Sequence, residues 1–246
     1  MATSTAPVLS GKQREIQLRD DRFIDAAQEI LLRDGYHGLT MAQVAAATGF
    51  SKGTVYNHFS CKEELVVALG ARLRGERLAL MERAIAVPGR PRERMVAIGE
   101  SAEYFARTNP AGVRVLNLIL AEAILEKVSD EQREALLDFD ARGLRYMVGI
   151  VDEAITAGDL TLPARTTPQE LSFALWALVD GGQAAAVSGV PLEKVGIPDA
   201  YGAIGRGGHL LMDGAGWRPL STEWDYSATS KRIKSAAFGG AEGAMA

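Results

Sequence analysis

The stretch between Gly35 and Lys62 has the side chains needed to bind a polyanion, because it contains no Asp or Glu. Val55 and Phe59 are four residues apart and are expected to anchor one face of a short helix over residues 52–58. The other positions of this helix carry groups that donate hydrogen bonds: Lys52, Thr54, Tyr56, Asn57 and His58. A helix surface with many donors and no carboxylate suits the phosphates and base edges of a nucleic acid.

Two short helices joined by a tight turn must position this surface. Thr40 and Gln43 have the spacing of a capping box, which predicts that a helix begins after Thr40. Gly49 can adopt the left-handed conformation that ends a helix, and Ser51 can cap the next one. A turn of about three residues between two such helices is typical of a DNA-binding helix-turn-helix. A preceding helix over residues 19–33 is expected to form the floor beneath them.

The run LTMAQVAAATGFSKGTVYNHFSCKEEL, residues 39–65, resembles the N-terminal domain of the TetR/AcrR family of bacterial transcriptional regulators. This resemblance implies that the second short helix faces the major groove through Lys52, Gly53, Thr54, Tyr56 and Asn57. It also implies that phosphates are held by Thr40, Tyr56, His58 and Lys62, with Ser51 included in the same DNA-binding surface.

Several of these residues have a structural alternative. Thr40 caps its helix whether or not it contacts DNA, and the alternative for His58 is to cover the side of Phe59. The arginines of the preceding helix either touch phosphate or pair with Asp20, Asp21 or Asp25; these arginines are Arg19 and Arg22.

Cys61 stands where the family commonly has a small polar residue that caps the next helix. Ser60 and Glu63 have the spacing of a capping box of their own, so Ser60 is expected to replace it as the cap.

Composition limits the other possibilities. The net charge of −4 over 246 residues means that nucleic-acid binding must depend on a local surface. A single cysteine excludes an internal disulfide and fits a reducing compartment. No apolar run approaches the roughly 18 residues of a membrane span, and the N-terminus lacks the apolar core of a signal peptide. A cytoplasmic protein without a membrane partner is therefore expected.

The fold class predicted is all-α. Beyond the helix-turn-helix, apolar periodicity and breaks at proline and glycine predict helices over residues 62–86, 92–107, 111–127, 130–157, 168–188 and 198–212. The expected organisation is a flexible arm (1–17), a helix-turn-helix domain (18–66), a larger helical effector-binding and dimerisation domain (67–216) and a flexible tail (217–246). For the arm, the alternative is a basic extension that reaches DNA through Lys12 and Arg14.

The last predicted helix carries Gly202, Gly205 and Gly208 at a spacing of three. Each interior glycine costs a helix about 1 kcal/mol relative to alanine, so the close approach of another helix is expected to compensate. The resemblance implies that the last two predicted helices form a four-helix bundle with their copies in a homodimer. Packing within one subunit is the alternative.

The resemblance also places an effector pocket among the middle helices. Its candidate residues are polar or aromatic side chains that interrupt apolar faces: Tyr104, Asn117, Glu122, Tyr146, Trp176 and Asp180. For each of them the alternative is a satisfied core or interface group. The surrounding sequence is mainly apolar, which favours a lipophilic or aromatic effector.

The residues give no indication of an enzyme. His37, His58 and His209 are scattered without metal-ligand spacing, and the sequence has no nucleophile motif or Walker-type loop, so neither cofactor nor metal is expected. The sequence as a whole predicts a homodimeric regulator, a repressor that a small effector releases from a palindromic DNA operator. The alternative is a small-molecule-binding helical protein whose DNA-binding role is minor or activating.

Overall fold

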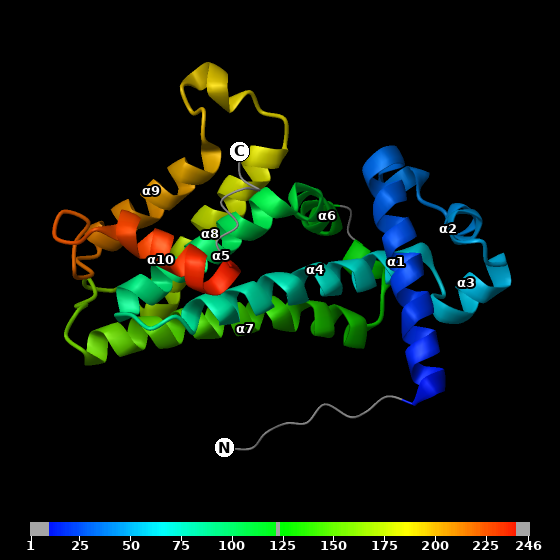
Figure 1. Cartoon of the computed structure of the whole chain (residues 1–246), viewed down its shortest axis with the longest axis horizontal. Coiled ribbons are helices and arrows are strands. Elements are labelled where there is room, and N and C mark those ends of the chain that lie inside the picture. Colours follow the sequence, from blue (N-terminus) through cyan, green and yellow to red (C-terminus); the bar gives the residue numbers. More distant parts are fainter. Residues whose placement is uncertain (1–9, 122–123, 240–246) are drawn as a thin grey trace. The chain divides into compact units, whose positions relative to one another are not determined.

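The computed structural model describes residues 10–121 and 124–239, and all regular structure within these residues is helical, as the sequence predicts. Contacts divide the chain into two compact units (Figure 1). The smaller unit contains the residues up to Gly70 together with Leu118–Arg133, and the larger contains Ala71–Asn117 and the residues from Glu134 onward. An N-terminal helix-turn-helix domain is thus followed by a larger helical domain.

The smaller unit contains three successive helices, α1 (Gly11–Gly38), α2 (Met41–Thr48) and α3 (Lys52–His58), and the start of α4 (Lys62–Ile85). The predicted start of α1 at Arg19 and the predicted flexibility of residues 11–17 are wrong. Ser10 caps the helix early, because its hydroxyl accepts from the Gln13 amide while the Gln13 side chain accepts from the Ser10 amide at 2.8 Å. The rest of the predicted arm, residues 1–9, lies outside the described residues.

The core of the smaller unit follows the predicted apolar face of α1. Gly35 has φ 72° and interrupts the helical backbone where the sequence predicts its end. The face that precedes it is buried through Phe23, Ala26, Ala27, Ile30 and Leu31. It is joined by buried side chains from the other segments, among them Leu39, Val44, Val55, Leu65 and Leu69. Full burial of each large apolar side chain contributes roughly 1.5–3 kcal/mol, so this small core can fix the position of α3.

The remaining helices are α5 (Pro91–Thr108), α6 (Pro110–Ala121), η1 (Ile124–Lys127), α7 (Asp130–Thr156), α8 (Pro168–Val187), η2 (Leu192–Val195), α9 (Ala200–Gly214) and α10 (Tyr226–Phe238). Capping side chains begin two of the predicted helices: Ser129 and Gln132 exchange hydrogen bonds before α7, and Thr167 and Glu170 form a capping box before α8. One helix was expected over residues 111–127. The structure instead has α6 and the separate 3-10 turn η1 in this range.

The predicted flexible tail after residue 216 is also wrong for residues 217–239, which include α10. This helix packs against α5, with Tyr226, Ile233, Ala237 and Phe238 buried in the core of the larger unit. Ion pairs add to the apolar contact, because Arg232 reaches Glu93 at 2.8 Å and Lys234 reaches Glu100 at 2.8 Å. Residues 240–246 lie outside the described residues.

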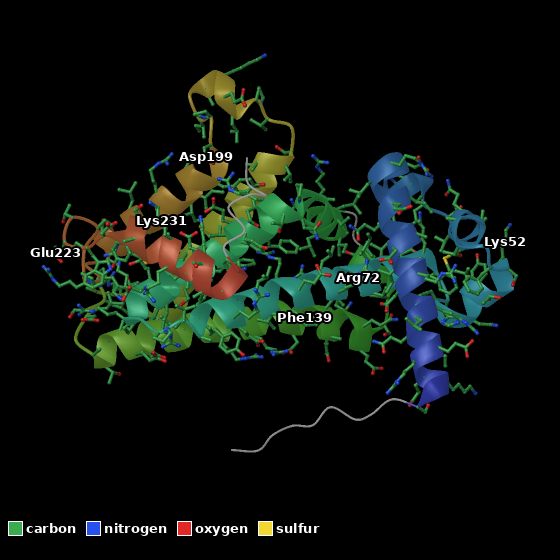
Figure 2. The ribbon with its side chains drawn as sticks, viewed as in Figure 1. Lys52, Arg72, Phe139, Asp199, Glu223 and Lys231 are labelled. Carbon is green, nitrogen blue, oxygen red and sulfur yellow. The ribbon has the colours of Figure 1, made fainter. Side chains whose placement is uncertain are left out.

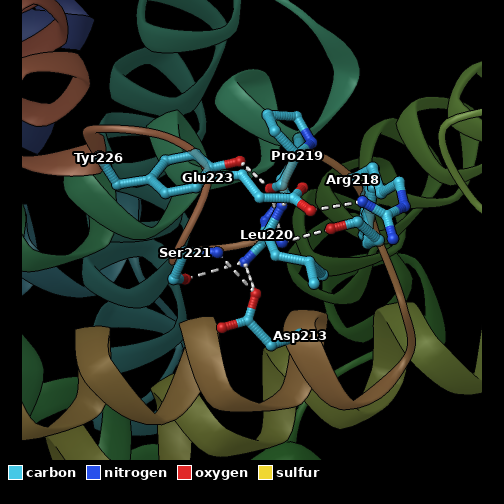
Figure 3. A network of polar contacts seen from close by, with 9 residues as sticks. Asp213, Arg218, Pro219, Leu220, Ser221, Glu223 and Tyr226 are labelled. Atoms are coloured by element: carbon cyan, nitrogen blue, oxygen red, sulfur yellow. Dashed lines mark hydrogen bonds and ion pairs between the residues drawn. The ribbon is translucent and has the colours of Figure 1, made fainter.

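A polar network holds the segment between α9 and α10, and Figure 3 shows Asp213, Pro219 and Ser221 within it. Arg92 of α5 is hydrogen-bonded to all three. Arg92 is fully buried, and its guanidinium donates to the carbonyl oxygens of Trp217 and Pro219. It also donates to the Asp213 carboxylate at 2.7 Å and to the Ser221 hydroxyl at 3.2 Å. The segment is therefore attached to α5 through backbone carbonyls, which residue types alone do not reveal.

Candidate nucleic-acid interface and ligand cavity

The helix-turn-helix is built by the predicted caps. Thr40 accepts from the Gln43 amide at 3.2 Å, and the Gln43 side chain accepts from the Thr40 amide at 3.0 Å. Gly49 ends α2 in the left-handed conformation with φ 74°. The Ser51 hydroxyl then accepts from the Thr54 amide at 3.1 Å and starts α3. Each of these side-chain caps stabilises its helix by about 1 kcal/mol.

The donor-rich surface of α3 is available to a partner. Val55 is fully buried and Phe59 nearly so, which turns the rest of the helix outward. Lys52, marked in Figure 2, is exposed, and Tyr56 keeps 52% of its surface accessible. Gly53 and Asn57 are exposed as well, while Thr54 is half-buried with its hydroxyl 2.9 Å from that of Ser51.

His58 faces inward rather than outward. Its Nδ1 lies 2.6 Å from an Asp20 carboxylate oxygen, and its ring packs edge-on against Phe23 with centroids 5.3 Å apart. The residue therefore joins the end of α3 to α1. Only its second ring nitrogen, Nε2, is left for an external group.

Lys62 is partly engaged by Tyr36. Its ammonium donates to the Tyr36 carbonyl at 3.1 Å and lies 4.1 Å from the centre of the Tyr36 ring. The Tyr36 hydroxyl donates to Glu63 at 2.5 Å; burial alone would raise the pKa of Glu63, but this hydrogen bond helps to hold it below the usual value. The sequence predicts a capping box in which Glu63 accepts from the Ser60 amide. This partner is wrong, because the Ser60 amide donates to Glu64, the next residue, at 2.7 Å.

Arg19 and Arg22 of α1 differ in the contacts they make. Arg19 pairs with Glu15 one turn earlier. Arg22 donates to the Thr48 carbonyl at 3.3 Å and lies over the Phe50 ring. A cation at the last carbonyls of α2 is favoured by the helix dipole, so Arg22 stabilises the first helix of the pair.

The larger unit encloses a cavity with about 110 Å³ available to the centre of a water molecule. A single water needs roughly 10–15 Å³ by this measure, so the space can hold a larger molecule. Trp176 and Asp180, both predicted, line it. Its apolar wall includes Met81, Met95, Ile98, Met147, Leu175, Val179, Ile204 and Met212.

The other predicted pocket residues lie elsewhere. Tyr104 stacks on Phe238 at 4.4 Å, and the Tyr146 hydroxyl donates to Glu82 at 2.7 Å. Asn117 is half-buried and does not line the cavity, and Glu122 lies outside the described residues. The sequence missed Gln183 and His209, which do line it. Two sequence signals could have indicated them: Gln183 is a polar residue among the small residues of α8, and His209 lies among the glycines of α9.

The charged groups of the cavity wall have partners in the protein. Arg77 and Asp180 form an ion pair at 2.8 Å. Glu100 is paired with Lys234, and Glu103 accepts from Arg107 at 2.7 Å. Gln183 is buried, and its side-chain nitrogen donates to the Ala102 carbonyl at 2.9 Å. The wall thus offers apolar surface and neutral polar groups more than free charge.

Gly205 and Gly208 of α9 were expected to allow the close approach of another helix. Within this chain they do not have that role. A Cβ at Gly205 or Gly208 would meet nothing within 4 Å, and both residues line the cavity. The close approach of α8 and α9 occurs instead at Gly182, where a Cβ would lie 2.5 Å from Ile204, and at Gly207, beside Leu178. Gly205 and Gly208 therefore leave space that a ligand can fill.

His209 predicts a pH dependence of stability. Burial, together with the nearby Arg92 charge, lowers its pKa from the usual 6.5, so the unfolded chain binds the proton more readily. The stability due to the neutral ring is complete above the unfolded pKa and declines as the pH falls below it. We expect the melting temperature to fall between about pH 7 and pH 5.5, and His209→Gln to reduce the fall. An equal fall in the variant would assign the effect to other groups.

Two further observations concern the described residues. None of their helices is both long and apolar enough to cross a membrane. No three of their His, Cys, Asp or Glu side chains are grouped so as to hold a metal ion.

Comparison with known proteins places the helix-turn-helix in a described family. Residues 23–69 match the family of bacterial regulatory proteins, tetR family. The fatty acid metabolism regulator protein of Bacillus subtilis (strain 168) is 26% identical over 139 residues, which cover 56% of this chain and 69% of that protein. The transcriptional activator FasR of Mycolicibacterium smegmatis is 31% identical over 101 residues, covering 40% of this chain and 46% of that protein.

The fold extends the likeness along the chain. The structure of the transcriptional regulator FadR from Bacillus subtilis, in complex with stearoyl-CoA, has a TM-score of 0.61 at 20% identity. The match covers 79% of this chain and 98% of that one. At this identity the likeness shows a shared fold.

Proposed function

Since the chain is a member of the TetR family of bacterial regulatory proteins, we propose that it is a sequence-specific DNA-binding transcription regulator controlled by a small effector. The observation that carries the proposal is the exposed, carboxylate-free surface of α3 at the end of a fully capped helix-turn-helix. Such a surface presents donors to DNA without the repulsion that an acidic side chain would add. Its named relatives are regulators, and we assign it no catalytic role.

The proposed contacts follow the resemblance to the family. Base edges in the major groove are assigned to Lys52, Gly53, Thr54, Tyr56 and Asn57, and phosphates to Thr40, Ser51, Tyr56, His58 and Lys62. Lys and Asn side chains can donate to base edges, and the missing side chain at Gly53 allows a close backbone approach. His58 would contact phosphate through Nε2, because Asp20 occupies Nδ1. Lys62 has further ammonium hydrogens beyond the one given to Tyr36.

We propose that the regulator acts as a homodimer on a palindromic operator. Two copies of α3 related by a two-fold axis would enter successive major grooves about 34–36 Å apart. Large apolar side chains exposed on α8 and α9 support an interface through these helices, because Phe173 is 57% exposed and Leu210 72% exposed. In a soluble protein such a surface is favourably covered by a second copy.

The cavity is the proposed effector site, with Trp176 and Asp180 as its predicted contacts. Tyr104, Asn117 and Tyr146 do not line it and Glu122 lies outside the described residues, so these four are not among the proposed contacts. Mainly apolar walls favour a lipophilic or aromatic effector, and the relative solved with stearoyl-CoA supports the lipophilic class.

Release from DNA requires the effector to prefer a conformer whose α3 spacing no longer fits the operator. A preference of about 5.5 kcal/mol changes occupancy from nearly full to nearly empty. This describes a repressor. The alternative is an activator, supported by the name of the FasR relative, in which the effector-bound form would be the one that binds DNA.

A competition assay tests the proposal. The purified protein is titrated against a labelled fragment of the DNA upstream of its own gene, with the same fragment or an unrelated one as unlabelled competitor. We expect tight, saturable binding that only the specific competitor removes. Weak binding to both fragments, repeated with fragments from neighbouring genes, would reject a sequence-specific regulator.

A variant that fills the cavity should separate the two functions. Gly208→Leu places a side chain where a Cβ meets nothing within 4 Å, and leucine stabilises the helix interior relative to glycine by nearly 1 kcal/mol. We expect normal operator binding and loss of the effector response, measured by fluorescence anisotropy of labelled operator. Gly214→Ala, near the end of the same helix and outside the cavity wall, is the control. An unchanged effector response in Gly208→Leu would exclude this cavity as the site.

A further inference from the structure

A second, smaller cavity lies beside the one already described. It has about 50 Å³ available to the centre of a water molecule. The two cavities share four wall residues, namely Arg77, Met81, Ala102 and Trp176. The cavities are therefore neighbours, and Met81 and Trp176 are part of the wall of each.

The shared wall, here called the partition, contains two large side chains that can repack, those of Met81 and Trp176. Met81 is unbranched and flexible, so its side chain can repack when a ligand enters. A Cβ at Gly143 would lie 3.5 Å from the terminal methyl of Met81, which shows that α7 approaches this side chain closely at a glycine. Trp176 is half-buried, and its ring lies 5.9 Å from that of Phe173. Rotation of these two side chains would join the cavities into one elongated space.

One donor in the smaller cavity lacks a partner. Arg74 lines this cavity with only 6% of its surface exposed, and its guanidinium forms an ion pair with Asp140. Its Nε–H has no hydrogen-bond partner among the described residues. A buried donor left unpaired costs about 1–3 kcal/mol, so an acceptor supplied by a ligand would be favoured here.

Each charged group around this donor has a partner of opposite charge, although burial and the charge of Arg77 lower the pKa of Arg74 to about 10. Arg74 is paired with Asp140, and Arg77 is paired with Asp180 at 2.8 Å. In the larger cavity, Glu100 and Glu103 are likewise paired with cations behind the wall, Lys234 and Arg107. A carboxylate or a quaternary ammonium entering this space would lose its hydration without meeting an uncompensated opposite charge. An uncharged acceptor avoids this cost.

We propose that the two cavities form one site for an uncharged, linear lipophilic molecule with a carbonyl acceptor, such as an ester or thioester. The carbonyl accepts from Arg74 Nε in the smaller cavity, and the alkyl chain passes between Met81 and Trp176 into the larger one. This inference rests on the proposed effector function and names the ligand class of that site.

The test compares three probes of equal chain length on the purified full-length protein, below their micellar concentrations. These probes are methyl decanoate, decanoate and decyltrimethylammonium, titrated by calorimetry. We expect the ester to bind roughly tenfold or more tightly than either ion, because only the ions lose hydration without compensation. Equal or tighter binding of decanoate would overturn the assignment of an uncharged ligand.

The partition is tested by chain length. In Trp176→Ala the cavities merge, so methyl tetradecanoate should gain roughly fivefold in affinity relative to methyl decanoate. Met81→Ala removes a side chain of the same partition from α4 and should also raise the affinity for methyl tetradecanoate relative to methyl decanoate. This second variant keeps the test available when the first does not fold. Trp224→Ala, outside both cavity walls, is the control. An unchanged ratio in the folded variants would overturn the joined site.

The outcomes separate this inference from the proposed function. A protein that binds operator DNA and responds to other compounds, but binds none of the three probes, overturns the inference and leaves the regulator in place. A protein that binds the ester and no DNA supports the site and rejects the regulator.

Discussion

Replacing Lys52 or Tyr56 with alanine should weaken operator binding roughly tenfold or more in each case, without unfolding the protein. Both side chains are exposed on α3 and neither contributes to the buried core, so their loss removes donors to DNA and little else. Lys52→Ala should also lower the slope of affinity against salt concentration by about one ion, because it removes one positive charge from the DNA interface, whereas Tyr56→Ala removes no charge and should leave this slope unchanged.

Lys231 provides the matched control for Lys52. It is an exposed lysine on α10, so Lys231→Ala makes the same change of charge on a helix that the proposed interface does not use (Figure 2). We expect its operator affinity to equal that of the wild type. If Lys52→Ala and Lys231→Ala behave alike, and Tyr56→Ala also retains full affinity, α3 is not the helix that reads DNA.

Asp213→Ala should destabilise the larger unit by about 3–5 kcal/mol, because it leaves the fully buried Arg92 without its carboxylate. The variant also removes the acceptor of the Ser221 amide, so the segment that leads to α10 loses one of its attachments. Chemical denaturation monitored by circular dichroism measures the change.

The nearby pair of Arg218 and Glu223 is the control, because its side chains are 60% and 40% exposed, whereas Arg92 is fully buried. Glu223→Ala should cost about 1 kcal/mol or less. A similar loss in Asp213→Ala and Glu223→Ala would mean that the Arg92 network does not hold α10.

Acid provides a second test of this network. Burial alone would raise the pKa of Asp213, but the Ser221 amide and the Arg92 guanidinium hold it below its usual value. Its contribution to stability is therefore present above the unfolded pKa and is lost as the pH falls through the lower folded pKa. The difference in stability between wild type and Asp213→Ala should shrink below about pH 4.

The sequence predicts the parts of the fold that depend on neighbouring residues. Thr40 with Gln43, and Ser51, cap the helices they were expected to cap, because a cap needs only a side chain and an amide three residues away. Gly49 is left-handed for an equally local reason. The exposed surface of α3 follows from the inward positions of Val55 and Phe59.

The features that the sequence did not predict depend on distant residues. Residues 226–238 form α10 because Arg232 and Lys234 pair with carboxylates on α5, more than 100 positions away. The ring of Phe238 also stacks on that of Tyr104. Tyr226, Ile233 and Ala237 do have helical spacing, a signal that the low aliphatic content obscured. In the same way, His58 points to Asp20 of α1, which its position in the motif does not indicate.

The cavity illustrates a different limit. Trp176 and Asp180 were found because they interrupt an apolar face, but Tyr104 and Tyr146 interrupt their faces equally and have partners inside the protein. Pattern identifies a buried polar group without saying whether a side chain or a ligand satisfies it. Gly205 and Gly208 leave space for the cavity because they have no side chain. A missing side chain adds nothing to an apolar or polar pattern, so the sequence does not indicate this role.

The central claim is that paired copies of α3 read an operator, and hydroxyl-radical footprinting of the fragment bound in the competition assay tests it most directly. We predict two protected patches on one face of the DNA, with centres about 34–36 Å apart, and their loss with Lys52→Ala at the same protein concentration. A single patch, or protection that spreads evenly along the fragment and persists in Lys52→Ala, would contradict the account.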